Sequence, residues 1–162
     1  MDQSDIITPV CGTQTPITSV EDLIVKHEGR VATVYKDSRG IPTIGIGHNL
    51  EASPLPAGMT PPLTDAQIDQ LFLADLEAIR SELVAALPWV NQLDEVRRAV
   101  LLDMAFNMGV ETLCGFHHTL EAIQRADWQA AADGMRHSLW ARQVGPRATE
   151  DAEMMRTGLW PT

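Results

Sequence analysis

A segment beyond the middle of the chain constrains the fold more than any other. The run DEVRRAVLLDMAFNM, from Asp94 to Met108, is apolar around most of the circumference of a helix, and Gly109 follows it as a stop signal. A surface helix needs an apolar stripe on one side only. The pattern therefore predicts a central buried helix that other elements must surround, and beyond Pro88 the chain is predicted to be all helix.

The N-terminal part of the chain has a different pattern. Ser19 can cap a short helix, which Gly29 ends. Between residues 30 and 50, β-branched residues and a tyrosine favour strands, with a turn in the middle. This region is predicted to form a small β-hairpin, with Asp37 near its tip and Thr43 on the returning strand.

A second long helix is predicted to start at Thr64, where the sequence Thr64-x-x-Gln67 is a capping box. Further helices are expected at about residues 119–126, 127–139 and 147–156. The expected fold class is α+β and mostly helical. We expect a loosely ordered lead (1–18) and one domain (19–162), divided into an N-lobe (19–63), a connecting helix (64–87) and a C-lobe (88–162).

Composition excludes some partners and locations. Twelve basic and 22 acidic residues give a net charge of −10, which disfavours nucleic acid and anionic membranes. No apolar run reaches the roughly 18 residues that a membrane span needs. The first 20 residues lack a basic start and an apolar stretch, so we expect no signal peptide and synthesis in a host cytoplasm. We also expect a monomer.

The chain has two cysteines, Cys11 and Cys114. Two unpaired thiols in a reducing compartment are expected, and a bridge between the N-terminal lead and the body stays open. No Cys/His spacing typical of a metal site is present, and no cofactor or metal is expected.

Two acids and a hydroxyl are closely spaced near the N-terminus. Eight residues separate Glu28 from Asp37, and five separate Asp37 from Thr43. Glu28 lies on the last turn of its helix, where the helix dipole disfavours an acid, and this is a mild indication of function. Two carboxyl groups and a hydroxyl can protonate a leaving oxygen and activate a water, which is the minimum for hydrolysis of a glycosidic bond.

With these residues placed, the chain resembles the T-even phage lysozyme family, glycoside hydrolase family 24. The resemblance covers about residues 20–160. It rests on the run from Glu28 to His48 and on the segments DEVRRAVLLDMAFNMG, GFHHTLEAIQRADWQAAA and SLWARQVGPRATEDAEMMRTGLW. It implies a two-lobed lysozyme fold and a muramidase that cleaves the β-1,4 bond between N-acetylmuramic acid and N-acetylglucosamine in bacterial peptidoglycan, with action in the periplasm after release through the membrane or on a virion.

The resemblance also implies roles for single residues. Glu28 matches the general acid of the family, Asp37 the second carboxylate and Thr43 the hydroxyl beside it. In the inverting mechanism, Asp37 and Thr43 hold a water on the far side of the sugar from Glu28. Arg147 matches an arginine that reaches across the cleft toward the catalytic glutamate.

The resemblance also gives an interpretation for four further positions, of which the last is a substrate-binding one. His48 and Asp75 match a structural ion pair, so we assign them to stability. His27 stands where the family commonly has an acid beside the catalytic glutamate, and we interpret it as a surface change. Asn49 matches a position that contacts the glycan through its backbone.

Substrate-binding positions follow in the same way. Phe106 and Asn107 match residues at the back of the cleft, and Thr119 and Asp133 match polar residues that contact the glycan. Each also has a plain structural interpretation, because an aromatic residue among methionines in an apolar helix is commonly a core residue.

Two other functions stay open. A lytic transglycosylase can work with a single acid/base and leaves anhydro sugar ends, but the presence of Asp37 and Thr43 argues against it. A glycan-binding or inhibitor-binding module on the same scaffold would be favoured by loss of Glu28 or Asp37, and both are present. A bacterial effector with the same domain is a further possible origin.

Overall fold

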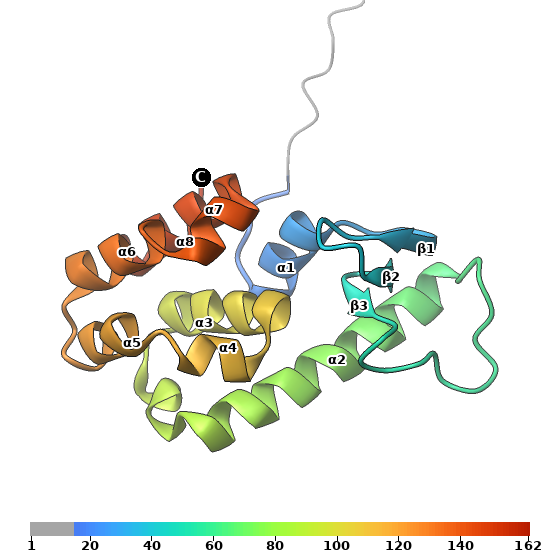
Figure 1. The fold of residues 1–162 in the computed structure, drawn as a ribbon, viewed down its shortest axis with the longest axis horizontal. Coiled ribbons are helices and arrows are strands. Elements are labelled where there is room, and N and C mark those ends of the chain that lie inside the picture. The colour runs from blue at the N-terminus through green and yellow to red at the C-terminus, as the bar shows by residue number, and fades with distance from the viewer. Residues whose placement is uncertain (1–14) are drawn as a thin grey trace, which may run out of the picture.

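The computed structural model describes residues 15–162, and Cys11 and most of the expected lead lie outside this range. The fold is α+β and mostly helical, as predicted (Figure 1). Its elements are α1 (Val20–Glu28), β1 (Val31–Lys36), β2 (Pro42–Gly45), β3 (His48–Asn49), α2 (Asp65–Ala86), the 3-10 helix η1 (Pro88–Gln92), α3 (Glu95–Met108), α4 (Val110–Cys114), α5 (His117–Gln124), α6 (Trp128–Arg136), α7 (Leu139–Val144) and α8 (Pro146–Thr157).

The predicted caps hold the first helices. The Ser19 side chain accepts a hydrogen bond from the Asp22 amide, and Thr64 and Gln67 form the reciprocal capping box at the start of α2. Asp94 caps α3 by accepting a hydrogen bond from the Arg97 amide. Each cap satisfies amide groups that the helix itself leaves without a partner.

The predicted hairpin forms the first two strands of a small antiparallel sheet with the order β1-β2-β3. Tyr35 faces Thr43 across the hairpin, and Thr43 faces Asn49 on the other side. The third strand was not predicted, because two residues are too short to show an alternating pattern.

Helix α3 lies inside the helical part of the molecule (Figure 1), as predicted. Every residue from Ala99 to Ala105 is buried, so more than one side of the helix faces other elements. Its apolar side chains form one hydrophobic cluster with residues from α1, α2, η1 and α4–α8. This cluster fixes the relative positions of α1, α3 and α8, which carry the candidate site.

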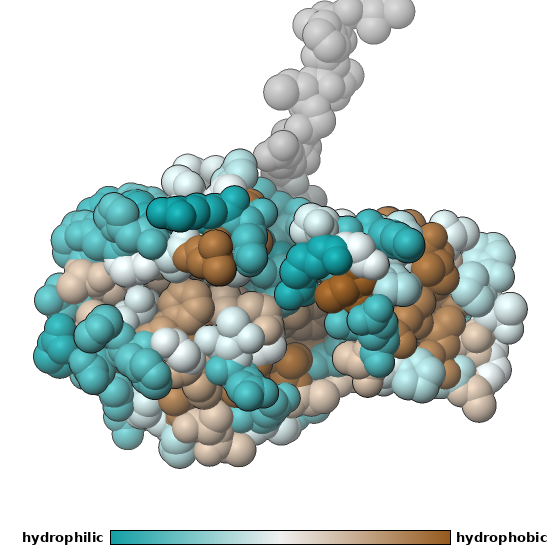
Figure 2. Space-filling view, in the orientation of Figure 1, coloured by the Kyte–Doolittle hydropathy of each residue, from teal (hydrophilic) through white to brown (hydrophobic). Residues whose placement is uncertain are grey.

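A second hydrophobic cluster lies beside the sheet. Ile44 and Ile46 pack there with Ile24 of α1 and with Ile68 and Phe72 of α2. Helix α2 contributes its first half to this cluster and Leu83 to the helical one, and it runs along one side of the molecule between them (Figure 1). Figure 2 shows apolar side chains gathered over the part that carries the sheet and mostly hydrophilic ones over the C-terminal helices.

The C-terminal helices differ in detail from the prediction. The expected helix over residues 127–139 is wrong as one element, because α6 ends at Arg136 and α7 begins at Leu139. Ser138 separates them, and its hydroxyl accepts from the Ala141 amide as the cap of α7. None of the helices within residues 15–162 is both long and apolar enough to cross a membrane.

Candidate active site

Glu28 is the last residue of α1, and its side chain is 15% exposed. Gly29 ends the helix with a φ of 72°, a conformation that glycine adopts at little cost. Gly47 lies directly against the Glu28 carboxyl group, since a Cβ atom there would be 2.8 Å from Glu28 Oε2. The second strand and the turn after it therefore form one wall around the Glu28 side chain.

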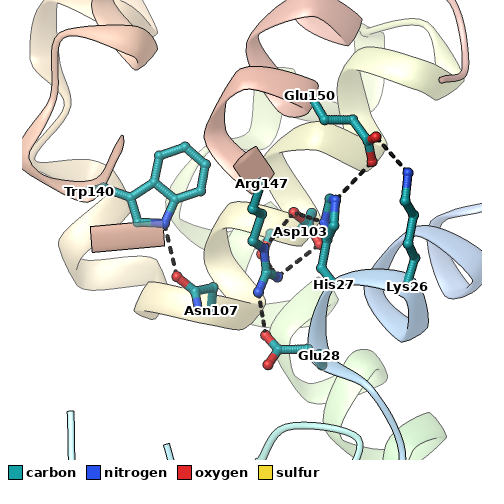
Figure 3. Close-up of polar contacts among 8 residues, drawn as sticks. All are labelled: Lys26, His27, Glu28, Asp103, Asn107, Trp140, Arg147 and Glu150. Atoms are coloured by element: carbon teal, nitrogen blue, oxygen red, sulfur yellow. Dashed lines mark hydrogen bonds and ion pairs between the residues drawn. The ribbon is translucent and has the colours of Figure 1, made fainter. Parts of the chain in front are cut away.

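Arg147 forms an ion pair with the other carboxylate oxygen of Glu28 (Figure 3). Gly145, with a φ of 60°, and Pro146 start α8, which places Arg147 in its first turn. Arg147 Nη1 donates to Glu28 Oε1 at 2.8 Å, and Nη2 and Nε donate to the two carboxylate oxygens of Asp103 at 2.9 and 3.1 Å. Burial alone would lower the pKa of Arg147, but Asp103 and Glu28 raise it above its usual value, so it stays a cation.

Asp103 is fully buried on α3 and also contacts His27, whose Nδ1 lies 2.9 Å from Asp103 Oδ2. His27 Nε2 lies 2.9 Å from Glu150 Oε1. Burial would raise the pKa of Asp103, but His27 and Arg147 together lower it to about 2, so the carboxylate is ionised. The interpretation of His27 as a surface change is wrong, because its side chain is only 6% exposed and lies between two carboxylates.

Asp37 and Thr43 lie on the hairpin beside this cluster. Asp37 Oδ1 accepts from the amides of Arg39 and Ile41 at 2.8 and 2.9 Å, which fixes the turn. Its second oxygen, Oδ2, has Arg39 Nη2 at 3.8 Å. The buried Thr43 hydroxyl donates to the Ile41 carbonyl at 2.8 Å, so its oxygen can still accept a hydrogen bond.

Tyr35 is half-buried on β1. Its pKa is raised first by burial and then by the negative charges of Glu28 and of Asp37. Sequence reasoning missed Tyr35, although its register opposite Thr43 is a signal that a predicted hairpin could have given.

Phe106 and Asn107 lie at the C-terminal end of α3. The Phe106 ring packs edge-on against Phe72, with 5.7 Å between ring centroids, and so joins the cluster beside the sheet. The side-chain Oδ1 of Asn107 accepts from Trp140 Nε1 at 2.8 Å, and the backbone carbonyl oxygen of Asn107 accepts from Arg39 Nη2 at 3.4 Å. Arg39 and Trp140 also line a pocket of about 490 Å³ beside α7.

Three predicted glycan contacts have structural partners of their own. Thr119 is 5% exposed and packs against Gly134, whereas Asp133 is exposed and accepts from Gln129. Within residues 15–162, no hydrogen bond or ion pair joins either one to the Glu28 cluster. Asn49 accepts from two following amides and thereby fixes the turn after β3. Their roles in glycan binding stay predictions.

The ion pair expected between His48 and Asp75 is present. His48 Nδ1 lies 2.6 Å from Asp75 Oδ2, and Nε2 lies 2.8 Å from the Ser53 carbonyl oxygen. The bond to Asp75 raises the pKa of His48, against the opposing effect of burial. This pair ties β3 and the loop after it to α2.

Asp103 and Asp151 are buried acids that the sequence reasoning did not select. An indication for Asp103 was present in the sequence, because it is an acid in a predicted central helix that is apolar around most of its circumference. No indication was present for Asp151, since α8 is rich in polar residues and one more acid does not stand out. Along the described chain, His27, Asp103 and Asp151 are also the three residues with ligand atoms close enough together to be considered for a metal ion.

Comparison with known proteins gives the chain a family. The phage lysozyme family model matches residues 25–151. The chain is 27% identical to "Probable T4-type lysozyme 1" of Dictyostelium discoideum, with 88% of this chain and 96% of that protein aligned. It is 33% identical to an endolysin of Salmonella phage P22, over 72% of this chain and 77% of that protein. It is 30% identical to the pre-baseplate central spike protein of Enterobacteria phage T4, of which the alignment spans only 28%. Since the family model covers most of its length, the chain belongs to the phage lysozyme family.

Proposed function

We propose that the chain is a muramidase that hydrolyses the β-1,4 bond between N-acetylmuramic acid and N-acetylglucosamine in bacterial peptidoglycan. Membership of the phage lysozyme family supports peptidoglycan hydrolysis by a glycosidase. One observation supports the proposed bond and mechanism. The Glu28 carboxyl group contacts both Arg147 and Gly47, and the nearby hairpin carries a second carboxylate and a hydroxyl.

Glu28 is proposed as the general acid that protonates the leaving sugar oxygen. Arg147 donates to Glu28 Oε1, so Oε2 is the oxygen proposed to deliver the proton to the sugar.

Asp37 and Thr43 are proposed to hold the attacking water. Asp37 Oδ1 is committed to the turn, so Oδ2 is the atom that can accept a proton from water. The Thr43 hydroxyl already donates to a carbonyl and is left to accept the other water hydrogen. A water whose two hydrogens are both held turns a lone pair toward the anomeric carbon, and we expect inversion of configuration.

The two settings expected from the sequence are both proposed for this chain. An endolysin and a virion spike protein are among its relatives. Release into the periplasm late in infection and carriage on a particle both bring such an enzyme to peptidoglycan.

Digestion of purified peptidoglycan with product identification by mass spectrometry tests the proposal. The wild type should release fragments with reducing N-acetylmuramic acid ends, and Glu28→Gln should lose at least about a hundredfold in rate because the general acid is gone. Glu21→Gln is a matched control, since the same change is made on the exposed first turn of α1. Anhydro ends would instead identify a transglycosylase, and binding without any product would identify a glycan-binding module.

A further inference from the structure

Asp151 of α8 is completely buried, yet neither of its carboxylate oxygens has a hydrogen-bond donor. An ionised carboxylate removed from water without donors is one of the most unfavourable groups a protein can bury. The side chain must therefore be in another state, and its surroundings indicate which one.

Helices α1, α3 and α8 present charged groups to Asp151, and α6 packs against α8 beside them. Its carboxyl group lies within 4.8 Å of ligand atoms of His27 on α1 and Asp103 on α3. On α8 itself, the charges of Arg147 and Glu150 act on it. On α6, Arg136 pairs with Glu153. Asp103 already accepts hydrogen bonds from His27 and Arg147.

The charges around Asp151 balance without it. Both ring nitrogens of His27 face carboxylate oxygens, and both contacts are hydrogen bonds only when both nitrogens carry a proton. The cluster in Figure 3 then contains three cations and three anions. They are Lys26, His27 and Arg147, and Glu28, Asp103 and Glu150. No cation is left to neutralise a fourth carboxylate, so the neutral acid is the favoured state of Asp151.

A metal ion is a poorer occupant of this position than a proton. His27, Asp103 and Asp151 could each offer one ligand atom. However, Arg147 donates to both oxygens of Asp103, so a metal bound there would lie beside a guanidinium group.

We propose that Asp151 is a positioning residue for the Glu28 site. As a neutral carboxylic acid, it donates its O–H to the Asp103 carboxylate. This hydrogen bond keeps Asp103 in the position from which it holds Arg147 against Glu28. The positioning role rests on the function proposed above, whereas the protonated state does not. In support, burial first and the charge of Asp103 second raise the pKa of Asp151 well above its usual range.

The protonated state makes stability depend on pH with a defined sign. A carboxyl group whose pKa is raised in the fold binds its proton more tightly folded than unfolded. Its contribution to stability is therefore largest below the unfolded pKa, about 3.9, and decreases as pH rises toward the folded pKa. Asp151→Asn removes this dependence, because an amide keeps the shape and an N–H donor without taking up a proton.

The first experiment compares the Tm of wild type and Asp151→Asn from about pH 5 to about pH 8. The Tm of Asp151→Asn minus that of wild type should grow by several degrees over this range, and the exposed control Asp65→Asn should show no such trend. Infrared spectra at neutral pH should show a protonated-carboxyl C=O band in wild type that is missing in Asp151→Asn. A Tm difference that is constant with pH, together with no such band, would overturn the proposal.

The second experiment tests positioning by the rates on soluble peptidoglycan fragments. Asp151→Leu has a similar shape but no donor, and it should lower kcat at least about fivefold with little change in KM, while Asp151→Asn restores kcat to near that of wild type. Equal kcat values for the Leu and Asn variants overturn the positioning role. A folded wild type without turnover would contradict the muramidase proposal and the positioning role with it, while the Tm and infrared results would still decide the protonated state.

Discussion

Arg147 connects the candidate acid to the interior of the protein. Its side chain is 9% exposed, and its guanidinium group donates to both Glu28 and Asp103. Removal of one partner from a buried ion pair leaves an uncompensated charge and commonly costs about 3–5 kcal/mol. A change at Arg147 therefore affects stability and the site together, so the two roles are better separated by substitutions at its partners.

At His48, the pair with Asp75 predicts a pH-dependent loss of stability in His48→Asn. The pKa of His48 is raised in the fold, so its contribution to stability is fully present below the unfolded value, about 6.5, and is lost as pH rises through the folded pKa. A charged hydrogen bond contributes about 2 kcal/mol, which corresponds to a Tm decrease of about 4–8 °C in a domain of this size. Thermal denaturation from about pH 5.5 to pH 9 measures it.

The surface pair of Arg30 and Asp69 provides the control for His48. Both side chains are partly or largely exposed, so Arg30→Gln should lower the Tm by no more than about 2 °C. A Tm gap between wild type and His48→Asn that stays constant with pH would mean that lost packing, and not the charged pair, accounts for the effect. Peptidoglycan hydrolysis by His48→Asn should stay within about threefold of wild type, because the pair lies between β3 and α2.

At the scale of elements, the hairpin turn and the proposed water site share one residue. Asp37 fixes the turn through Oδ1 and has Oδ2 left for chemistry. In Asp37→Asn the amide oxygen can keep both turn bonds while the base is lost. The Tm should then change by less than about 2 °C, whereas kcat should fall by about a hundredfold or more.

Asp37→Ala separates the two contributions. It removes the base and the turn acceptor together, so it should show the same loss of kcat and, in addition, a Tm decrease equivalent to about 1–2 kcal/mol. Calorimetry and initial rates on soluble fragments measure both quantities. Nearly wild-type turnover in Asp37→Asn would contradict the assignment of Asp37 as the base.

Local signals predicted the longer elements and failed for the shortest. Ser19 and Thr64 cap their helices by accepting hydrogen bonds from amides three residues further along the chain. A signal of such short range can be recognised in the sequence alone. Helices α4 and α7 have five and six residues, less than two turns, so no apolar period can develop. Their existence depends on packing into the helical cluster, which is a property of the whole chain.

The candidate site divides in the same way. Glu28, Asp37 and Thr43 could be selected because a helix end and the hairpin after it bring them together over a short stretch of sequence. His27 was misinterpreted, since its partners, the buried Asp103 and the partly buried Glu150, lie 76 and 123 residues further along the chain. A buried polar network assembled from distant helices leaves no periodic trace in the sequence.

For the whole molecule, the net charge of −10 predicts how salt affects the proposed activity. A bacterial wall is anionic, so enzyme and substrate repel each other at long range. The screening length is about 30 Å at 0.01 M salt and about 10 Å at 0.1 M salt. Addition of moderate salt should therefore raise the rate on intact peptidoglycan severalfold by allowing closer approach.

Turbidity clearing of purified walls across this range of salt measures the effect, and a short neutral glycan fragment serves as the control substrate. The rate on the fragment should stay nearly constant, because it carries no field to repel the enzyme. A rate on walls that falls steeply from the lowest salt concentration would contradict the argument and would mean that a local basic surface, rather than the net charge, governs the approach. A severalfold rise in the rate on walls, without a rise on the fragment, would mean that long-range attraction contributes nothing to the encounter with the wall. Such an enzyme would depend on delivery close to its substrate, as on a particle or in a confined periplasm.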